Sequence, residues 1–218
     1  MSSLHTCNHW IFDLDDTLAK SAIDFDAMRR ELGLPLGKPI LEEIETRPAN
    51  EADALHTRLA ELERGYALRA TPLPGVHDLL TELVKFNSRL GILTRNSRDN
   101  ALETLAVCNL DGFFDSADVL GRDEAAPKPE PDGIRKLLAA WKTTPERAAM
   151  VGDFRYDLEA GRRAGVITVY YDAHNKDLWS AEADHRVNSH TELLNLLRRT
   201  VASKAPKNAL STRDPSHA

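Results

Sequence analysis

The chain has 218 residues, of which 42% are hydrophobic, and its formal net charge at pH 7 is -6. This length fits one medium-sized domain with an insertion, or two small ones, and the apolar content is sufficient for a core. Because no basic tract dominates, the composition argues against nucleic acid or an anionic membrane as the main partner.

Targeting and disulfide signals are missing from the sequence. No apolar run approaches the length of a membrane span, and residues 1–7 lack the basic and apolar regions of a signal peptide. The two cysteines, Cys7 and Cys108, indicate no disulfide framework, and the eight histidines lack zinc-ligand spacing. We therefore expect a reduced, cytoplasmic protein.

The most informative segment lies near the start of the chain. Residues 9–12 are a short apolar run, and Asp13-Leu14-Asp15-Asp16-Thr17-Leu18 follows directly. The run predicts a buried strand that ends in two carboxylates two residues apart. Because open α/β sheets bind ligands at the carboxyl ends of their strands, we predict a nucleophile, a proton donor and a cation site here. Taken alone, the segment equally fits a strand followed by an Asp-rich helix cap.

Residues 19–72 differ from the rest of the chain. They contain no convincing strand, and apolar spacing predicts three helices near residues 28–34, 40–44 and 55–66. We predict a helical insertion over 19–72 within a catalytic core formed by 1–18 and 73–200. The insertion carries arginines able to face an anionic substrate: Arg29, Arg30, Arg47, Arg58, Arg64 and Arg69. The polar tail, residues 201–218, is predicted to be disordered.

Strand and helix signals alternate from residue 74 onward. Helices are predicted after Pro74-Gly75, over about 97–106, from Pro131, and over about 156–164 with Gly165 as the stop. Strands are predicted over 89–93, 117–120, 148–152 and 166–170. This alternation predicts a parallel sheet with helices on both faces, that is, a Rossmann-like three-layer α/β core.

Three later segments place polar side chains beside these elements: Thr94 at the end of the second strand, Lys128 in the Pro-rich loop 126–131, and Asp153 after Gly152, with Asp157 four residues on. Together with the first segment, and in this order, they resemble the four motifs of the haloacid dehalogenase-like phosphohydrolase superfamily. The resemblance runs from about residue 9 to about residue 190. The helical insertion is similar to the cap domain of the phosphoglycolate phosphatase-like branch, although it is short for such a cap.

The resemblance implies a Mg²⁺-dependent phosphatase that hydrolyses a small phosphorylated metabolite, with phosphoglycolate as one plausible substrate. It assigns Asp13 as the nucleophile that forms an aspartyl-phosphate. Asp15 would protonate the leaving oxygen and later activate water. True dehalogenases lack this second aspartate because a halide needs no proton, so Asp15 favours phosphoryl chemistry.

The remaining motif residues would bind the phosphoryl group. Thr94 offers a hydroxyl, and the backbone amide that follows it offers a second donor. Lys128, held by flanking prolines, can pair with Asp13 and the phosphoryl group. Arg95 replaces the asparagine that many relatives carry, with Asn96 next, and it either contacts substrate or faces water.

The predicted metal site uses oxygen ligands, as Mg²⁺ prefers. Asp153 and Asp13 would bind the ion directly, together with the main-chain carbonyl of Asp15. Asp157 would act through water or by orienting Lys128, and Gly152 would allow close backbone approach.

Two other functions remain open at this level. A sugar phosphomutase of the β-phosphoglucomutase type shares all four motifs, because only the acceptor of the phosphoryl group differs. A catalytically silent binding module is the other alternative, although such a protein has no chemical need for all four motifs. The sequence leaves monomer and homodimer equally open.

Overall fold

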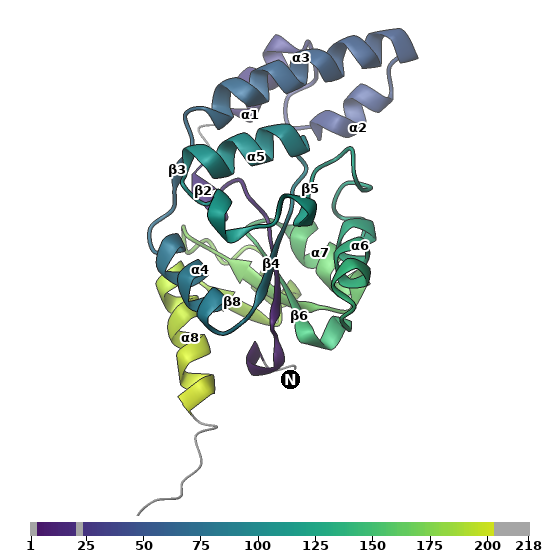
Figure 1. Cartoon of the computed structure of the whole chain (residues 1–218). Helices are drawn as coiled ribbons and strands as arrows, with labels where there is room; N and C mark the ends of the chain where they lie inside the picture. The colour runs from purple at the N-terminus through teal and green to yellow at the C-terminus, as the bar shows by residue number, and fades with distance from the viewer. Residues whose placement is uncertain (1–3, 21–23, 203–218) are drawn as a thin grey trace, which may run out of the picture.

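In a computed structural model, residues 4–20 and 24–202 are described, and they form a parallel sheet covered by helices on both faces (Figure 1). The strands are β1 (His9–Phe12), β4 (Arg89–Leu93), β5 (Val119–Leu120), β6 (Ala148–Gly152), β7 (Ile167–Tyr171) and β8 (His185–Val187). Their order is β5-β4-β1-β6-β7-β8, and every neighbouring pair is parallel. The predicted Rossmann-like α/β fold is therefore confirmed.

Helices form the two outer layers of this core. They are α4 (Val76–Lys85), α5 (Arg98–Val107) and α8 (His190–Ala202) on one face, and α6 (Asp132–Trp141) and α7 (Arg155–Ala164) on the other. Successive strand residues point to opposite faces. Trp10 and Phe12 of β1 accordingly pack with the first layer, whereas Ile11 packs with the second. Short 3-10 turns lie at Leu4–Thr6, Asp111–Phe113, Ser116–Asp118, Pro145–Arg147 and Ser180–Glu182.

Most of the predicted elements occur within one or two residues of their expected bounds. Ser97 caps α5 by accepting a hydrogen bond from the Asn100 amide at 3.3 Å, and Gly165 ends α7 with φ of 79°. The strand predicted over 117–120 is shorter, because the Asp115 carboxylate accepts from the Ala117 amide at 2.9 Å and turns the chain there.

Neither β8 nor α8 was predicted from the sequence. The predicted disordered tail starts at residue 201, but α8 continues through Ala202, and residues 203–218 lie outside the described residues.

Three further helices form a separate layer above the carboxyl ends of the strands (Figure 1): α1 (Phe25–Glu31), α2 (Ile40–Glu45) and α3 (Ala49–Ala67). This helical layer has its own apolar cluster, which includes Met28, Ile44 and Leu59. The expectation that residues 19–72 contain no strand is wrong. The chain leaves and re-enters the core through two short antiparallel strands, β2 (Ala19–Lys20) and β3 (Thr71–Pro72), whose two-residue length carries no periodic signal.

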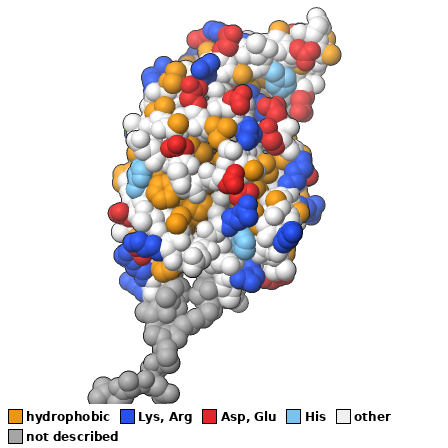
Figure 2. All heavy atoms as spheres, viewed as in Figure 1, with side chains coloured by type: hydrophobic (Ala, Val, Ile, Leu, Met, Phe, Trp, Pro, Cys, Tyr) orange, Lys and Arg blue, Asp and Glu red, His pale blue; other side chains and the backbone are white. Residues whose placement is uncertain are grey.

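Within residues 4–20 and 24–202, no helix is long and apolar enough to cross a bilayer. Acidic and basic side chains are interspersed over the face shown in Figure 2.

His190, at the start of α8, joins the loop after β1 to the sheet. Its ring is fully buried and stacks on Tyr171 with centroids 4.6 Å apart. Nε2 lies 2.8 Å from the Thr17 carbonyl oxygen, and Nδ1 lies 3.1 Å from that of Pro74. Burial lowers the pKa of His190, so the ring is neutral at pH 7 and carries one N–H. With a single N–H, the ring donates to one of these two carbonyls at a time.

Replacing this side chain tests its contribution to the fold. His190→Ala should lower the free energy of unfolding by about 2–4 kcal/mol, because it leaves a cavity and an unpaired buried carbonyl. Urea denaturation followed by circular dichroism measures this. His174→Ala, at an exposed histidine, should change stability by less than about 0.5 kcal/mol. Equal stability of the two variants would contradict the role given to His190.

Candidate active site

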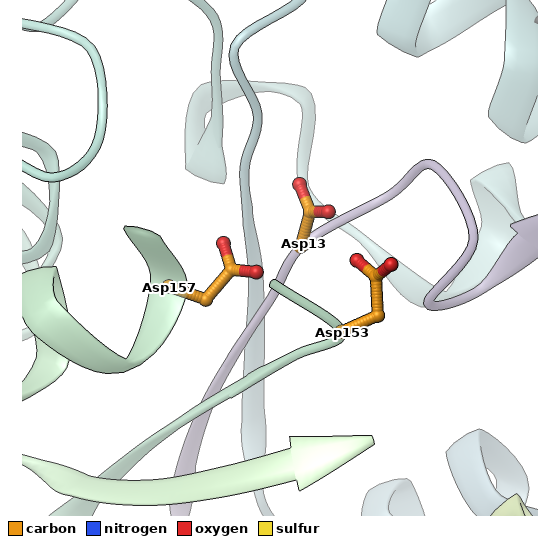
Figure 3. Close-up of side chains that lie close together, drawn as sticks. All are labelled: Asp13, Asp153 and Asp157. Atoms are coloured by element: carbon orange, nitrogen blue, oxygen red, sulfur yellow. The ribbon is translucent and has the colours of Figure 1, made fainter. Parts of the chain in front are cut away.

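Three carboxylates meet at the carboxyl ends of the central strands. Asp13 follows β1, Asp153 follows β6, and Asp157 lies in the first turn of α7. Figure 3 shows the carboxylate groups of the three side chains lying close together. One oxygen from each lies within 4.8 Å of the others. The Asp13 amide donates to the Val151 carbonyl at 2.9 Å, which continues the pairing of β1 with β6 and fixes this meeting.

Lys128 lies between two of these carboxylates. Its Nζ is 2.6 Å from Asp13 Oδ1 and 2.7 Å from Asp157 Oδ1, and its side chain is 3% exposed. Burial alone would lower the pKa of Lys128, but the two paired carboxylates outweigh it, so the pKa is raised. The ammonium therefore keeps its charge beside Asp13, as the sequence predicted.

Asp157 has both carboxylate oxygens engaged. Oδ1 pairs with Lys128, and Oδ2 accepts from the Phe154 amide at 3.0 Å. A Cβ at Gly152 would overlap the Asp157 side chain, so a glycine is needed at that position. This geometry favours the orientation of Lys128 over metal binding through water as the role of Asp157.

Asp153 lies where burial and neighbouring carboxylates disfavour its negative charge. Burial, and then the neighbouring Asp13 and Asp157, raise the pKa of Asp153 to about 8. Thr17 donates to Asp153 Oδ1 at 3.4 Å. Three converging carboxylates outnumber the single ammonium, and their hard oxygen atoms fit a divalent ion such as Mg²⁺. Since Asp157 is already engaged, Asp13 and Asp153 are the side chains best placed to hold it.

Asp15 lies beside this group and has an altered proton affinity. Burial, and then the charge of Asp13, raise the pKa of Asp15 to about 7, while a hydrogen bond from the Asn96 side chain acts in the opposite direction. The turn that places Asp15 is tight: the Leu14 carbonyl accepts from the amides of Leu18 and Ala19 at 2.9 and 3.0 Å. A carboxyl group with a pKa near 7 can both give and take a proton at neutral pH.

Thr94 and Asn96 form the adjoining wall. The Thr94 hydroxyl is buried and accepts from the Asn96 amide at 3.0 Å, so its own O–H stays available as a donor. The Asn96 side-chain oxygen accepts from the Ser97 amide at 2.8 Å, which directs its NH₂ group away from that amide.

Arg95, which the sequence left open as a substrate contact or a solvent-facing residue, lines the cavity and is paired with other protein groups. Its Nη2 contacts the two Glu42 carboxylate oxygens at 2.8 Å each, and its Nη1 donates to the Lys128 carbonyl. The guanidinium also lies over the Tyr156 ring, 5.0 Å from its centroid. Arg95 thus joins the helical layer to the loop that carries Lys128.

A second contact between the layers escaped sequence reasoning. Glu63 of α3 and Arg122, in the loop after β5, pair at 2.8 Å, and their side chains are 9% and 8% exposed. The Asn100 amide group donates to Glu63 at 3.4 Å. No local motif marks these residues, because they come from distant segments. Among the predicted arginines, Arg58 and Arg64 pair with glutamates instead of facing the site.

A cavity of about 480 Å³ lies between the motif residues and the helical layer. Asp13, Asp15, Thr94 and Lys128 line its floor, whereas α1, α2 and α3 contribute its opposite wall. Every predicted site residue except Gly152 lines this cavity.

Comparison with known proteins places the chain in a family. The model of haloacid dehalogenase-like hydrolases matches residues 23–171. The chain belongs to this family. It is similar to a haloacid dehalogenase-like hydrolase domain-containing protein of Arabidopsis thaliana, with 29% identity over 86% of this chain and 82% of that one. It is also similar to the pyrophosphatase PpaX of Bacillus velezensis, with 32% identity over 72% and 80% of the two chains.

Solved structures agree with the fold. A hydrolase from Pseudomonas syringae superposes with a TM-score of 0.74 at 24% identity, covering 88% of this chain and 98% of that one. The family match over residues 23–171 confirms the predicted superfamily and hydrolase class.

The close approach at Gly152 gives a test of the geometry. Gly152→Ala should lower the free energy of unfolding by about 1–3 kcal/mol, because the new Cβ overlaps Asp157 and forces it from Lys128. Gly112→Ala is the matched control, since a Cβ there meets no atom within 4 Å. Chemical denaturation measures both variants. Equal stability of the two would show that Asp157 can move without cost.

Proposed function

We propose that this hydrolase is a Mg²⁺-dependent phosphatase that cleaves a small phosphorylated metabolite through an aspartyl-phosphate on Asp13. The observation that carries the proposal is the Asp13 carboxylate held at 2.6 Å from a buried ammonium, on the floor of a cavity with a second carboxyl group, Asp15, two residues away. The similarity to a pyrophosphatase supports phosphoryl chemistry as the reaction class.

The first half-reaction uses Asp13 and Asp15 together. Lys128 engages Asp13 Oδ1, which leaves Oδ2 to attack phosphorus. The new O–P bond forms as the bond from phosphorus to the leaving oxygen breaks, and Asp15 gives its proton to that oxygen. The ammonium of Lys128 and the Thr94 hydroxyl stabilise charge on the equatorial oxygens.

The second half-reaction reverses the proton transfer. Asp15, now ionised, takes a proton from water as the water oxygen attacks the phosphoryl group. The bond between phosphorus and Asp13 breaks, and inorganic phosphate leaves. The raised pKa of Asp15 suits both steps, because the group must hold a proton at first and accept one later.

Asp13 and Asp153 would hold Mg²⁺, with the Asp15 main-chain carbonyl as the third predicted ligand. Bound there, the ion would supply positive charge that offsets the phosphoryl oxygens and the clustered carboxylates.

We also propose that residues 19–72 act as a cap over a core of residues 1–18 and 73–200. Two features support this division: the separate apolar cluster of the helical layer, and the paired strands β2 and β3 through which the chain crosses twice. The cap would exclude water and contact the leaving group. A cytoplasmic location is proposed as well, since Cys7 and Cys108 are both free thiols.

Asp13→Asn tests the nucleophile. Release of inorganic phosphate from 4-nitrophenyl phosphate should fall on the order of 10³-fold or more, because no other group can form the covalent intermediate. Asp111→Asn, at an exposed aspartate, should leave the rate unchanged. Near-normal phosphate release by Asp13→Asn would refute the assignment. Measuring released phosphate also separates hydrolysis from transfer to a second sugar hydroxyl.

Two measurements test the metal: activity after Mg²⁺ is removed, and the thermal stability of the protein with and without Mg²⁺. A chelator should abolish phosphate release, and added Mg²⁺ should restore it. Mg²⁺ should also raise the Tm of the unmodified chain, because a ligand that binds only the folded state stabilises it. Asp153→Ala should lose most of this Tm shift. Full activity in the presence of chelator would contradict the proposal.

A further inference from the structure

The cavity above Asp13 is lined by more acidic than basic side chains. Among the described residues that line it, six are acidic and three are basic. One of the six, Glu63, is already paired with Arg122, which lies outside the lining. A divalent ion would offset part of this excess near Asp13. The remainder of the cavity offers a poor environment for further negative charge on the substrate.

All three cations are already paired. Lys128 contacts Asp13 and Asp157, and Arg95 contacts both oxygens of Glu42. Arg29 donates to Asp26 Oδ1 at 2.9 Å and to the Lys38 carbonyl at 2.7 Å. A second anionic group on the substrate would therefore have to break an existing ion pair to find a cation among these lining residues. Losing its hydration in addition makes its burial costly.

Apart from Gly37, Thr94 and Asn96, the remaining lining residues are apolar or aromatic. These residues come from the helical layer and from the start of α7: Phe25, Met28, Pro39, Ile40, Leu41, Leu59, Phe154 and Tyr156. Phe154 lies edge-on to Tyr156 at 5.0 Å and to Trp179 at 5.8 Å, directly after Asp153 in the chain. An apolar group that enters the cavity gains roughly 25 cal/mol for each Å² of surface that it buries.

We propose, on the basis of the proposed phosphatase function, that the substrate is a phosphate monoester of an uncharged, largely apolar alcohol. The phosphoryl group would lie at Asp13, and the apolar alcohol would pack against the helical layer and the aromatic side chains of Phe154 and Tyr156. The cavity selects against substrates with a second anionic group, a class that includes both phosphoglycolate and pyrophosphate.

A matched pair of substrates tests this. 4-(Methoxycarbonyl)phenyl phosphate and 4-carboxyphenyl phosphate share a ring and a substitution position, and they differ mainly in one negative charge. At saturating Mg²⁺, kcat/KM should be at least about tenfold higher for the neutral ester. Benzyl phosphate should likewise be cleaved faster than phosphoglycolate, and both faster than pyrophosphate. An equal or higher kcat/KM for the anionic members would overturn the inference while leaving the phosphatase function intact. Absence of phosphate release from every compound would reject the phosphatase function itself.

Binding measured without turnover removes the effect of leaving-group reactivity. In the Asp13→Asn variant, calorimetry should give a lower Kd for the methoxycarbonyl ester than for the carboxy ester. Asp13→Asn removes one negative charge from the cavity, which by itself favours the anionic carboxy ester. The substitution therefore opposes the expected difference in Kd. A lower Kd for the carboxy ester would contradict the proposed wall chemistry.

A positive charge introduced into the cavity wall should weaken the preference for the neutral substrate over the anionic one. Phe25 lines the cavity and is 49% exposed, so Phe25→Lys is expected to fold and to lower the ratio of neutral to anionic kcat/KM about tenfold. Leu68→Lys is the matched control: Leu68 is 55% exposed, follows α3 and does not line the cavity. Its ratio should stay unchanged. If the ratio does not respond to Phe25→Lys, this wall does not contact the leaving group and the proposal fails.

Discussion

The ammonium of Lys128, buried between the carboxylates of Asp13 and Asp157, is the interaction on which the site depends. Isolated charges at this depth would lose their hydration without compensation and would tend to neutralise. Lys128 stays charged because three separate segments, the end of β1, the Pro-rich loop and the first turn of α7, bring it within 2.6 and 2.7 Å of the Asp13 and Asp157 carboxylates. Removing Lys128 would leave two buried carboxylates without their cation, so the geometry of the site and the packing of the sheet edge are coupled.

The same requirement explains several neighbouring choices of residue. Gly152 has no side chain because Asp157 occupies the space that a Cβ would fill. Phe154 gives its amide to Asp157, so the capping of α7 and the orientation of Lys128 use one carboxylate. The His190 ring contacts the Thr17 carbonyl, and the Thr17 hydroxyl contacts Asp153. Core packing on one side of the sheet thus fixes the loop that presents Asp13 and Asp15.

The helical layer is joined to the core by ion pairs of two kinds. The pair between Glu63 and Arg122 is nearly buried, so breaking it would leave an uncompensated charge between α3 and the core. The pair between Glu42 and Arg95 is more exposed and contributes less to stability. This pair mainly positions Arg95, whose guanidinium also donates to the Lys128 carbonyl. The helices that form the apolar wall of the cavity are therefore in contact with the loop that carries the buried ammonium.

The sequence by itself determined the elements and the chemical groups at their ends. Apolar runs marked β1, β4, β6 and β7, and helical spacing marked α4 to α7, since both signals are local. Asp13, Thr94 and Asp153 follow strands, so the parallel topology alone brings them to one edge. Only the tertiary structure decided what these groups touch. It assigned Asp157 to Lys128, joined Arg95 to Glu42 across 53 positions, and paired Glu63 with Arg122 across 59. The two-residue strands β2 and β3 and the buried His190 also lacked a sequence signal. Such contacts form between segments that carry no pattern of their own, and they exist only when packing brings those segments together.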